Sequence, residues 1–197
     1  MNIGIYIYED TEVLDFSGPF EVFSTANRFL SEKNHVCLIA ETTSAVAARG
    51  GYHVLPHHSI EQHPDLDVLI VVGGIHTKEM FNTPVIRWIS AQNSTVTILA
   101  SVCTGAFLLA EAGVLNHLTV TTHWEDIYDL KQGYADLTVV DNVRWVDQGR
   151  IITSGGISAG IDMSLHLLAK LYDIDLANKT ARQMEFDWQM NGLELQP

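Results

Sequence analysis

The sequence predicts an α/β fold, built as a three-layer α/β/α sandwich around a mainly parallel central sheet. Short β-branched apolar runs alternate with helix-forming segments along the chain, and this order is typical of a parallel sheet covered on both faces. The chain has 197 residues, of which 47% are hydrophobic. This is enough for one sizeable core, so we expect a single domain over residues 1–197.

Composition excludes several classes of function. The chain has 24 acidic and 11 basic residues, a formal net charge of −13, which argues against binding nucleic acid or an anionic membrane through a basic face. Cys37 and Cys103 are the only cysteines, too few for a disulfide framework and without metal-ligand spacing, which favours a reducing compartment. We find no signal-peptide pattern and no apolar run of about 18 residues. We therefore expect a cytoplasmic protein.

The N-terminal half contains three apolar runs rich in β-forming residues, which we predict to be buried strands: residues 3–8, 35–40 and 67–72. A loop over residues 9–18 follows the first run, and the first helix is predicted to begin at Pro19. Residues 45–48 and 52–55 resemble an edge hairpin. A further helix is predicted over residues 84–92.

The C-terminal half continues the alternation. Gly113 is a plausible C-cap for the helix before it. The other predicted elements are a strand over residues 118–121, a helix ending near residue 132, a hairpin of residues 138–146 and 150–153, and helices over residues 161–172 and 175–189.

The stretch Val96–Ala110 changes from a β-branched run to helix-forming residues with only a short turn between them. Cys103 lies in this turn, as the nucleophile does in a strand-to-helix elbow. A helix N-terminus lowers the pKa of a thiol, so the elbow favours a reactive thiolate. The alternative is a small buried hydrophobe, the commonest role of a free cysteine and the one we expect for Cys37.

The carboxyl ends of parallel strands meet at one edge of a sheet, which brings four segments together near Cys103. The first is the loop at Asp15, whose carboxylate either hydrogen-bonds the thiol or a water molecule, or caps the following helix. The second is Gly73-Gly74, which either offers backbone amides to developing negative charge or only forms a tight turn. The other two are Cys103-Thr104 and the turn at Gly155-Gly156.

The sequence leaves the roles of one threonine and several histidines open. His123 is either a base or a packed histidine. The Thr104 hydroxyl either covers the pocket or caps the helix. The remaining histidines of interest, whose spacing is not a strong zinc pattern, are His53, His57, His58 and His63. We therefore expect neither a metal nor another cofactor.

Four motifs together carry a family resemblance: residues 67–74 (DVLIVVGG), 100–106 (ASVCTGA), 121–124 (TTHW) and 153–162 (TSGGISAGID). They resemble the PfpI superfamily, which includes the Parkinson-disease-associated deglycase. The resemblance covers nearly the whole chain in order. It implies a flavodoxin-like, class I glutamine amidotransferase-like fold with Cys103 at a nucleophile elbow, and it implies a homodimer.

Within the superfamily, Leu14-Asp15-x-x-Gly18-Pro19 and the threonine after Cys103 are most similar to the isonitrile hydratases. The resemblance implies that the Cys103 thiolate attacks an isocyanide and that Asp15 activates water to release a formamide. Thr104 and the amides near Gly73 and Gly74 would hold the intermediate. The pocket residues that it implies are His123, Trp124, Gly156 and Ile157. The peptidase branch has histidine in the place of Thr104, so a peptidase dyad is not expected.

Two other functions remain open. The same motifs occur in the N-terminal domain of AraC-type transcription regulators, which implies a non-catalytic ligand or redox sensor as the alternative. The chain ends at Pro197 without a basic tail, so we do not expect direct DNA binding. The third reading is a deglycase or glyoxalase that acts on aldehydes such as methylglyoxal. In each case the expected partner is a small molecule.

Overall fold

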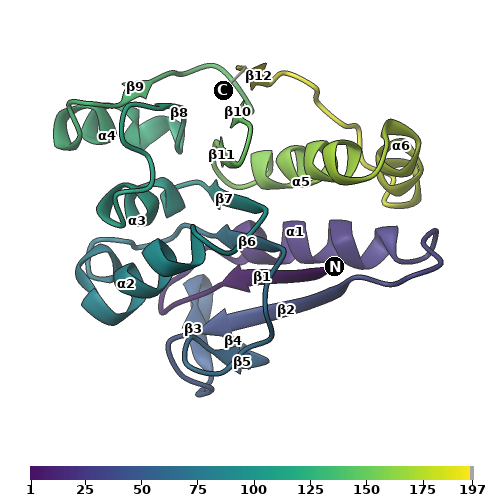
Figure 1. Ribbon diagram of the computed structural model, residues 1–197, viewed down its shortest axis with the longest axis horizontal. Helices are drawn as coiled ribbons and strands as arrows, with labels where there is room; N and C mark the ends of the chain where they lie inside the picture. The colour runs from purple at the N-terminus through teal and green to yellow at the C-terminus, as the bar shows by residue number, and fades with distance from the viewer. Residues whose placement is uncertain (196–197) are drawn as a thin grey trace.

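The computed structural model describes residues 1–195, and within them the main sheet has eight strands (Figure 1). Their order is β12 (Leu193–Glu194), β10 (Trp145–Gln148), β11 (Ile151–Ser154), β7 (Ile98–Val102), β6 (Val68–Val71), β1 (Asn2–Tyr6), β2 (His35–Ala40) and β5 (His58–Ser59). All neighbouring strands pair in parallel except β10 and β11, which form an antiparallel hairpin. The mainly parallel sheet predicted from the sequence is therefore present.

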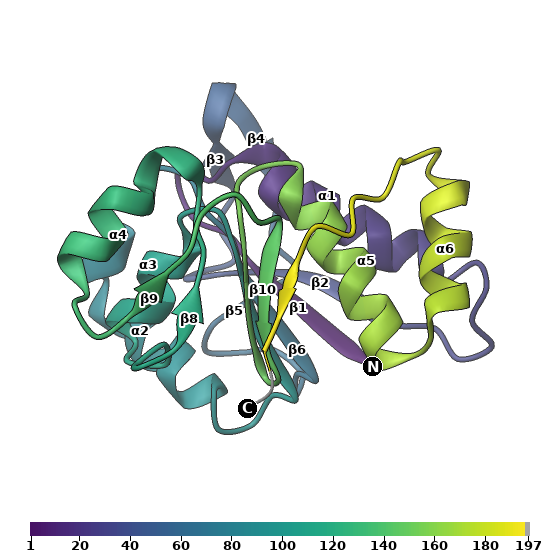
Figure 2. The same ribbon diagram turned by 90° about the horizontal axis from the view of Figure 1, so that it is seen from above.

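Helices cover both faces of this sheet, and the three layers are plain when the molecule is seen from above (Figure 2). One face carries α1 (Val13–Ala26), α5 (Ala159–Leu171) and α6 (Ile174–Gln183), and the other carries α2 (Thr83–Gln92), α3 (Gly105–Glu111) and α4 (Ile127–Gly133). Short 3-10 segments are η1 (Arg49–Gly51), η2 (Glu79–Phe81) and η3 (Trp124–Asp126). Each face encloses its own cluster of buried apolar side chains, so the sheet separates two cores.

The first helix begins earlier than predicted. We expected a loop to residue 18 and a helix from Pro19, but α1 starts at Val13 and contains Pro19. Proline inside a helix removes a hydrogen bond. Here the helix nevertheless buries Phe16, Val22 and Phe23 against the sheet, and that burial outweighs the loss. Because α1 starts at Val13, Asp15 lies on a helix rather than on a loop.

Two small sheets lie outside the main one. The hairpin predicted over residues 45–55 forms β3 (Val46–Ala48) and β4 (Tyr52–Val54), which pair with each other but not with the edge of the main sheet. The predicted strands at 118–121 and 138–146 are also shorter. They become β8 (Thr119–Val120) and β9 (Thr138–Val139), a parallel pair of their own, while β10 starts only at Trp145.

The last helix is shorter than the predicted span of residues 175–189, since α6 ends at Gln183. Glu185 has a φ of 51°, a left-handed conformation that cannot continue an α-helix. The chain then crosses back over α5, where the Trp188 indole N–H and the Gln189 amide donate to Asp162. It finally adds β12 beside β10. Tertiary contacts therefore end this helix, not a signal in its own sequence.

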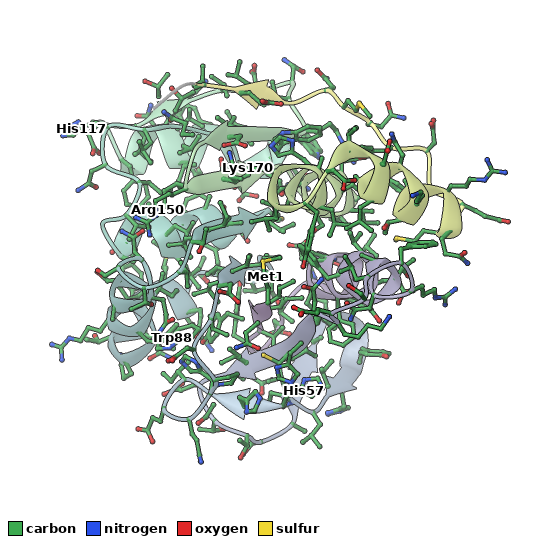
Figure 3. All side chains as sticks on the ribbon, turned by 45° about the vertical axis from the view of Figure 1, so that its right-hand side comes forward. Met1, His57, Trp88, His117, Arg150 and Lys170 are labelled. Carbon is green, nitrogen blue, oxygen red and sulfur yellow. The ribbon has the colours of Figure 1, made fainter. Side chains whose placement is uncertain are left out.

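A cluster of polar side chains around the buried carboxylate of Asp147 joins β10 to α5 (Figure 3, where Lys170 is labelled). Asp147 Oδ2 lies 2.7 Å from His166 Nε2 and 2.9 Å from Lys170 Nζ. Its Oδ1 accepts hydrogen bonds from Lys170 Nζ at 3.0 Å and from the Gly149 amide at 2.8 Å. Burial raises the pKa of Asp147, but these donors outweigh it, and the net direction is downward.

Across residues 1–195, no helix is both long and apolar enough to cross a membrane.

Candidate active site

Cys103 occupies the turn between β7 and α3, as the sequence predicts. Its φ is 56°, in the left-handed region that few residues other than glycine adopt. The surrounding backbone holds it there. The Cys103 amide donates to the carbonyl oxygens of Ser154 at 3.2 Å and Gly155 at 3.3 Å, and its own carbonyl oxygen accepts from Thr122 Oγ1 at 2.8 Å. Hydrogen bonds to both the amide and the carbonyl oxygen of Cys103 therefore hold the elbow in place.

Glycines let the elbow approach the end of β6 closely. A Cβ atom at Gly105 would lie 2.1 Å from the carbonyl oxygen of Val71, and one at Gly73 would lie 2.6 Å from the Thr104 amide nitrogen. Neither distance is possible for a real side chain. The two segments are thus in backbone contact, which explains why glycine stands at both positions.

Asp15 is fully buried in the first turn of α1. Its Oδ2 accepts a hydrogen bond from the Gly73 amide at 3.1 Å, whereas its Oδ1 has no partner. Burial raises the pKa of Asp15 to about 7, opposed by the Gly73 hydrogen bond and, more weakly, by the nearby thiol of Cys103. Asp15 therefore does not cap α1. It contacts the cysteine instead, with a carboxyl group close to half-ionised at neutral pH.

Thr104 ties the elbow to the glycine turn and does not cap α3 with its side chain. Its Oγ1 accepts from the Gly74 amide at 3.0 Å and donates to the Gly74 carbonyl oxygen at 3.1 Å. The two amides that we predicted as donors to negative charge are thus already engaged, Gly73 with Asp15 and Gly74 with Thr104. In the resting protein these glycines hold the side chains of the site in place.

A cavity of about 420 Å³ opens onto the sulfur of Cys103. Its inner wall includes Thr104, Gly74, His123 and Ile157, all of them predicted site residues. Its mouth is charged, and the residues there are Glu12, Arg49, Glu125 and Asp126. One pair among these is an ion pair, since Arg49 Nη1 lies 3.6 Å from Glu12 Oε2. A small molecule in this cavity would therefore lie near three acidic side chains and one basic one.

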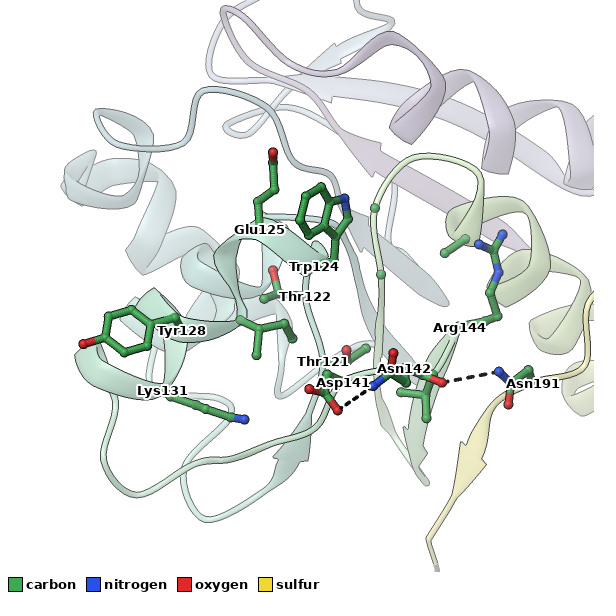
Figure 4. Close-up of a pocket in the computed structure, with 15 residues that line it drawn as sticks. Thr121, Thr122, Trp124, Glu125, Tyr128, Lys131, Asp141, Asn142, Arg144 and Asn191 are labelled. Carbon is green, nitrogen blue, oxygen red and sulfur yellow. Dashed lines mark hydrogen bonds between the residues drawn. The ribbon is translucent and has the colours of Figure 1, made fainter.

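A second cavity, of about 610 Å³, adjoins the first and shares Glu125 with it. Figure 4 shows Trp124 and Tyr128 on one side of this space, with Asn142 and Asn191 across from them. Trp124 is 76% exposed, so it belongs to this outer cavity and not to the immediate surroundings of Cys103. The outer cavity has room for a group attached to whatever reacts at the sulfur.

Gly156 lines the outer cavity and also contacts the site. A Cβ atom there would lie 2.0 Å from His123 Cδ2 and 3.1 Å from Cys103 Sγ. Nδ1 of His123 points away from the sulfur, toward the Glu125 amide and, at 3.4 Å, Asp126 Oδ2. His123 therefore packs at the site, with this nitrogen directed to its acidic neighbours.

The pKa of the Cys103 thiol differs from the sequence-based expectation. We expected the start of α3 to lower its pKa. Instead burial raises the pKa of Cys103, and the charge of Asp15 raises it further, while the Thr104 amide hydrogen bond opposes both. The group needs a base to lose its proton, and Asp15 is the nearest candidate. Cys37 is a core residue of β2, and burial raises its pKa to about 11.

Within residues 1–195, no three side chains of the metal-binding types converge to hold an ion. Two of the four histidines considered from the sequence have hydrogen-bond partners. Nδ1 of His57 accepts from the Leu38 amide at 2.9 Å, and Nε2 of His63 accepts from the Trp88 indole at 2.9 Å.

Sequence reasoning missed three participants in this site. Thr122 belongs to the 121–124 motif, which was a signal for it, but its contact with the Cys103 carbonyl depends on the fold. Arg49 comes from the β3–β4 hairpin, and no local pattern indicates that it reaches the mouth of the cavity. Tyr8 reads as one more apolar position after β1, and its hydroxyl lies buried behind Thr104.

Comparison with known proteins identifies a family whose sequences are similar to this chain. The sequence model of the DJ-1/PfpI family matches residues 1–170. The chain is similar to an isonitrile hydratase of Pseudomonas putida, with 30% identity over 187 residues that cover 94% of this chain and 78% of the relative. It is also similar to the HTH-type transcriptional regulator CdhR of Pseudomonas aeruginosa, with 29% identity over 171 residues. That match covers 87% of this chain but only 51% of the regulator.

Among solved structures, a THiJ/PfpI family protein from Pseudomonas syringae superposes with a TM-score of 0.85 at 23% identity. The superposition covers 94% of this chain and 75% of the other.

Proposed function

The chain belongs to the DJ-1/PfpI family, and from this premise we propose that it is a cysteine-dependent isonitrile hydratase. It would add water to an isocyanide and release an N-substituted formamide. The nucleophile is Cys103, the base is Asp15, and Thr104 holds the intermediate.

The observation that carries this proposal is the pairing of Asp15 with Cys103. A general base works best when its pKa lies near the working pH, and burial brings the pKa of Asp15 to about 7. Its Oδ1 has no partner and is free to accept a proton. The pair therefore has a thiol that needs a base and a carboxylate suited to be one.

In the first step, the Asp15 carboxylate takes the thiol proton, and the Cys103 sulfur attacks the terminal carbon of the isocyanide. Attack forms a C–S bond and places an electron pair on that carbon, which takes the proton back from Asp15. The product is a thioimidate, with the substrate nitrogen doubly bonded to the CH group. The N-substituent extends into the outer cavity.

In the second step, water adds to the thioimidate carbon. Asp15 accepts one water proton and passes it to the substrate nitrogen. The C–S bond then breaks and its electron pair returns to sulfur, while the hydroxyl proton moves through Asp15 to the thiolate. The N-substituted formamide leaves, and both side chains recover their starting states.

The proposal is tested by incubating the full chain with cyclohexyl isocyanide and measuring N-cyclohexylformamide. Wild type should form it, whereas Cys103→Ala should not. Cys37→Ala is the matched control, because it removes the other thiol, and it should retain the wild-type rate. Equal rates for wild type and Cys103→Ala would rule out hydration at this cysteine.

The second candidate is a ligand-sensing domain, favoured by the similarity to a regulator that the chain covers over about half of its length. This candidate predicts no formamide and no lactate from methylglyoxal. It predicts instead a saturable ligand-induced rise in thermal stability, lost when Gly156→Ala crowds the cavity. Lactate formation dependent on Cys103 would favour the aldehyde reading.

A further inference from the structure

Tyr8 is a buried phenol beside the site that the reaction above does not use. It follows β1 and is only 5% exposed, and it packs in the core on the α2 and α3 face of the sheet. Its hydroxyl has no well-formed hydrogen bond, and among residues 1–195 the only side chain near enough to act on it as a hydrogen-bond partner is Thr104. Leaving a buried donor without an acceptor destabilises a folded protein, and phenylalanine would fill the same space without that cost.

Tyr6 shows how the hydroxyl of a buried tyrosine usually finds an acceptor. Its ring stacks on that of Tyr8 with 6.1 Å between centroids, and its hydroxyl donates to Glu79. Tyr6 and Tyr8 therefore differ in the hydrogen bonding of their hydroxyl groups. One has an acceptor in the resting protein and the other does not.

The surroundings of the Tyr8 hydroxyl are the residues of the site. Burial raises the pKa of Tyr8, and the ionised forms of Asp15, Cys103 and Glu79 would raise it further, while hydrogen bonding with the Thr104 side chain lowers it. The phenol thus keeps its proton throughout the neutral pH range. It is a donor held next to Thr104, which is the residue assigned to the intermediate.

Thr104 itself has one hydroxyl proton and two acceptor positions. In the resting protein the proton points to the Gly74 carbonyl oxygen, and one acceptor position takes the Gly74 amide. To hold an intermediate, the Thr104 O–H must turn from Gly74 toward the substrate nitrogen. The second acceptor position of its oxygen can then receive Tyr8.

We propose that Tyr8 is a positioning residue of this site, which donates a hydrogen bond to Thr104 Oγ1 when the Thr104 hydroxyl turns to the intermediate. The inference rests on the proposed function. A donor on Oγ1 makes the Thr104 O–H a stronger donor in turn, because linked hydrogen bonds polarise one another. The Tyr8 bond forms whenever the Thr104 hydroxyl turns away from Gly74, toward the intermediate or toward a Cys103 thiolate, since Thr104 Oγ1 and Cys103 Cβ lie on the same side of Gly73.

The test is Tyr8→Phe in the full chain, with Tyr6→Phe as the matched control. Tyr8→Phe should unfold at the same or a higher urea concentration than wild type, yet its kcat for cyclohexyl isocyanide should fall about tenfold, the worth of one hydrogen bond. Its KM should change less than about twofold, since ground-state binding does not use the bond. Tyr6→Phe removes one of the donors to the half-buried carboxylate of Glu79, so it should lose stability and keep its kcat. An unchanged kcat in folded Tyr8→Phe would overturn the proposal.

A double-mutant cycle separates this role from a general packing effect. Because Tyr8 acts through Thr104, Tyr8→Phe should have no further effect on kcat in a Thr104→Val background. Multiplicative losses would contradict the proposal.

The role of Tyr8 can also be tested without the proposed isocyanide reaction. If wild type forms no formamide, Tyr8 is judged by the pH dependence of Cys103 alkylation with iodoacetamide. Loss of the donor should raise the midpoint of that profile in Tyr8→Phe, but not when Thr104 is already valine. A midpoint that does not move overturns the inference independently of isocyanide chemistry.

Discussion

Asp15 and Asp147 are both buried aspartates, but their surroundings are opposite. Asp147 receives donors on both oxygens, from His166, Lys170 and the Gly149 amide, and its pKa is lowered. Asp15 receives one hydrogen bond, from Gly73, and its pKa is raised to about 7. Burial is common to the two, so the number of donors decides which one is held ionised. A fully satisfied carboxylate stabilises a fold, whereas an unsatisfied one is available for chemistry.

The largest effect should come from neutralising the reactive member of this pair. Asp15→Asn keeps an acceptor for the Gly73 amide but removes the base, so formamide production should fall about 10³-fold. Asp147→Asn is the matched control and should leave kcat within about twofold, because it lies outside the site. If Asp15→Asn kept more than a tenth of the wild-type kcat, Asp15 would not be the base.

The pH dependence of unfolding should show the two carboxyl groups with opposite signs. Folding raises the pKa of Asp15 from 3.8 to about 7, so the folded state binds the proton more tightly and stability falls as pH rises through that range. At about 1.4 kcal/mol per pH unit, the loss is on the order of 4 kcal/mol. Urea titrations from pH 4 to pH 8 should show this slope in wild type and not in Asp15→Asn.

The pKa of Asp147 is lowered by folding, so its contribution has the opposite dependence. It is present above the pKa of the unfolded chain and lost as pH falls below about 4. A stability profile that rises steadily from pH 4 to pH 7 in wild type would contradict the assignment of Asp15.

Removing the satisfied carboxylate should cost stability and not activity. Asp147→Ala leaves His166 and Lys170 without their shared partner, and breaking such a buried pair costs about 3 kcal/mol. The free energy of unfolding in urea measures the loss. A milder change, Lys170→Met, removes the half-exposed partner and should cost about 1 kcal/mol. Equal losses for the two variants would mean that burial of Asp147 does not matter.

The smallest effect should separate two adjacent glycines that differ in their distance from the sulfur. A Cβ atom at Gly156 would collide with His123, whereas the nearest atom to one at Gly155 is the Ala159 Cβ at 3.5 Å. Gly156→Ala should therefore lower kcat/KM about tenfold, and Gly155→Ala should change it by less than about twofold. Circular dichroism should show both variants folded. Similar kinetics for the two would mean that His123 can move aside for a methyl group at position 156 without disturbing Cys103.

Much of this molecule could be predicted from local patterns. The strand at residues 35–40, the turn at Cys103 and the α/β order follow from apolar runs and turn residues. The start of α1 could not be predicted, because Pro19 is a common first residue of helices and only burial of Phe16 keeps the helix intact before it. The end of α6 depends in the same way on contacts made by Trp188 and Gln189 with Asp162.

Side-chain partners were harder to foresee than elements. The sequence placed Asp15, Gly73 and Cys103 at one edge of the sheet, and the structure joins them. It did not indicate that the amides of Gly73 and Gly74 would be occupied, or that burial would raise the pKa of Cys103. Both depend on distances between segments far apart in the chain, and on the burial that their packing produces.

The main sheet ends on both sides in very short strands. At one edge β5 spans His58–Ser59 and at the other β12 spans Leu193–Glu194. Long exposed edges invite another chain to add a strand, and proteins avoid such aggregation by keeping edge strands short. A sheet bounded in this way offers little template for fibril growth. Addition of a strand from another chain is therefore disfavoured at both edges of the sheet.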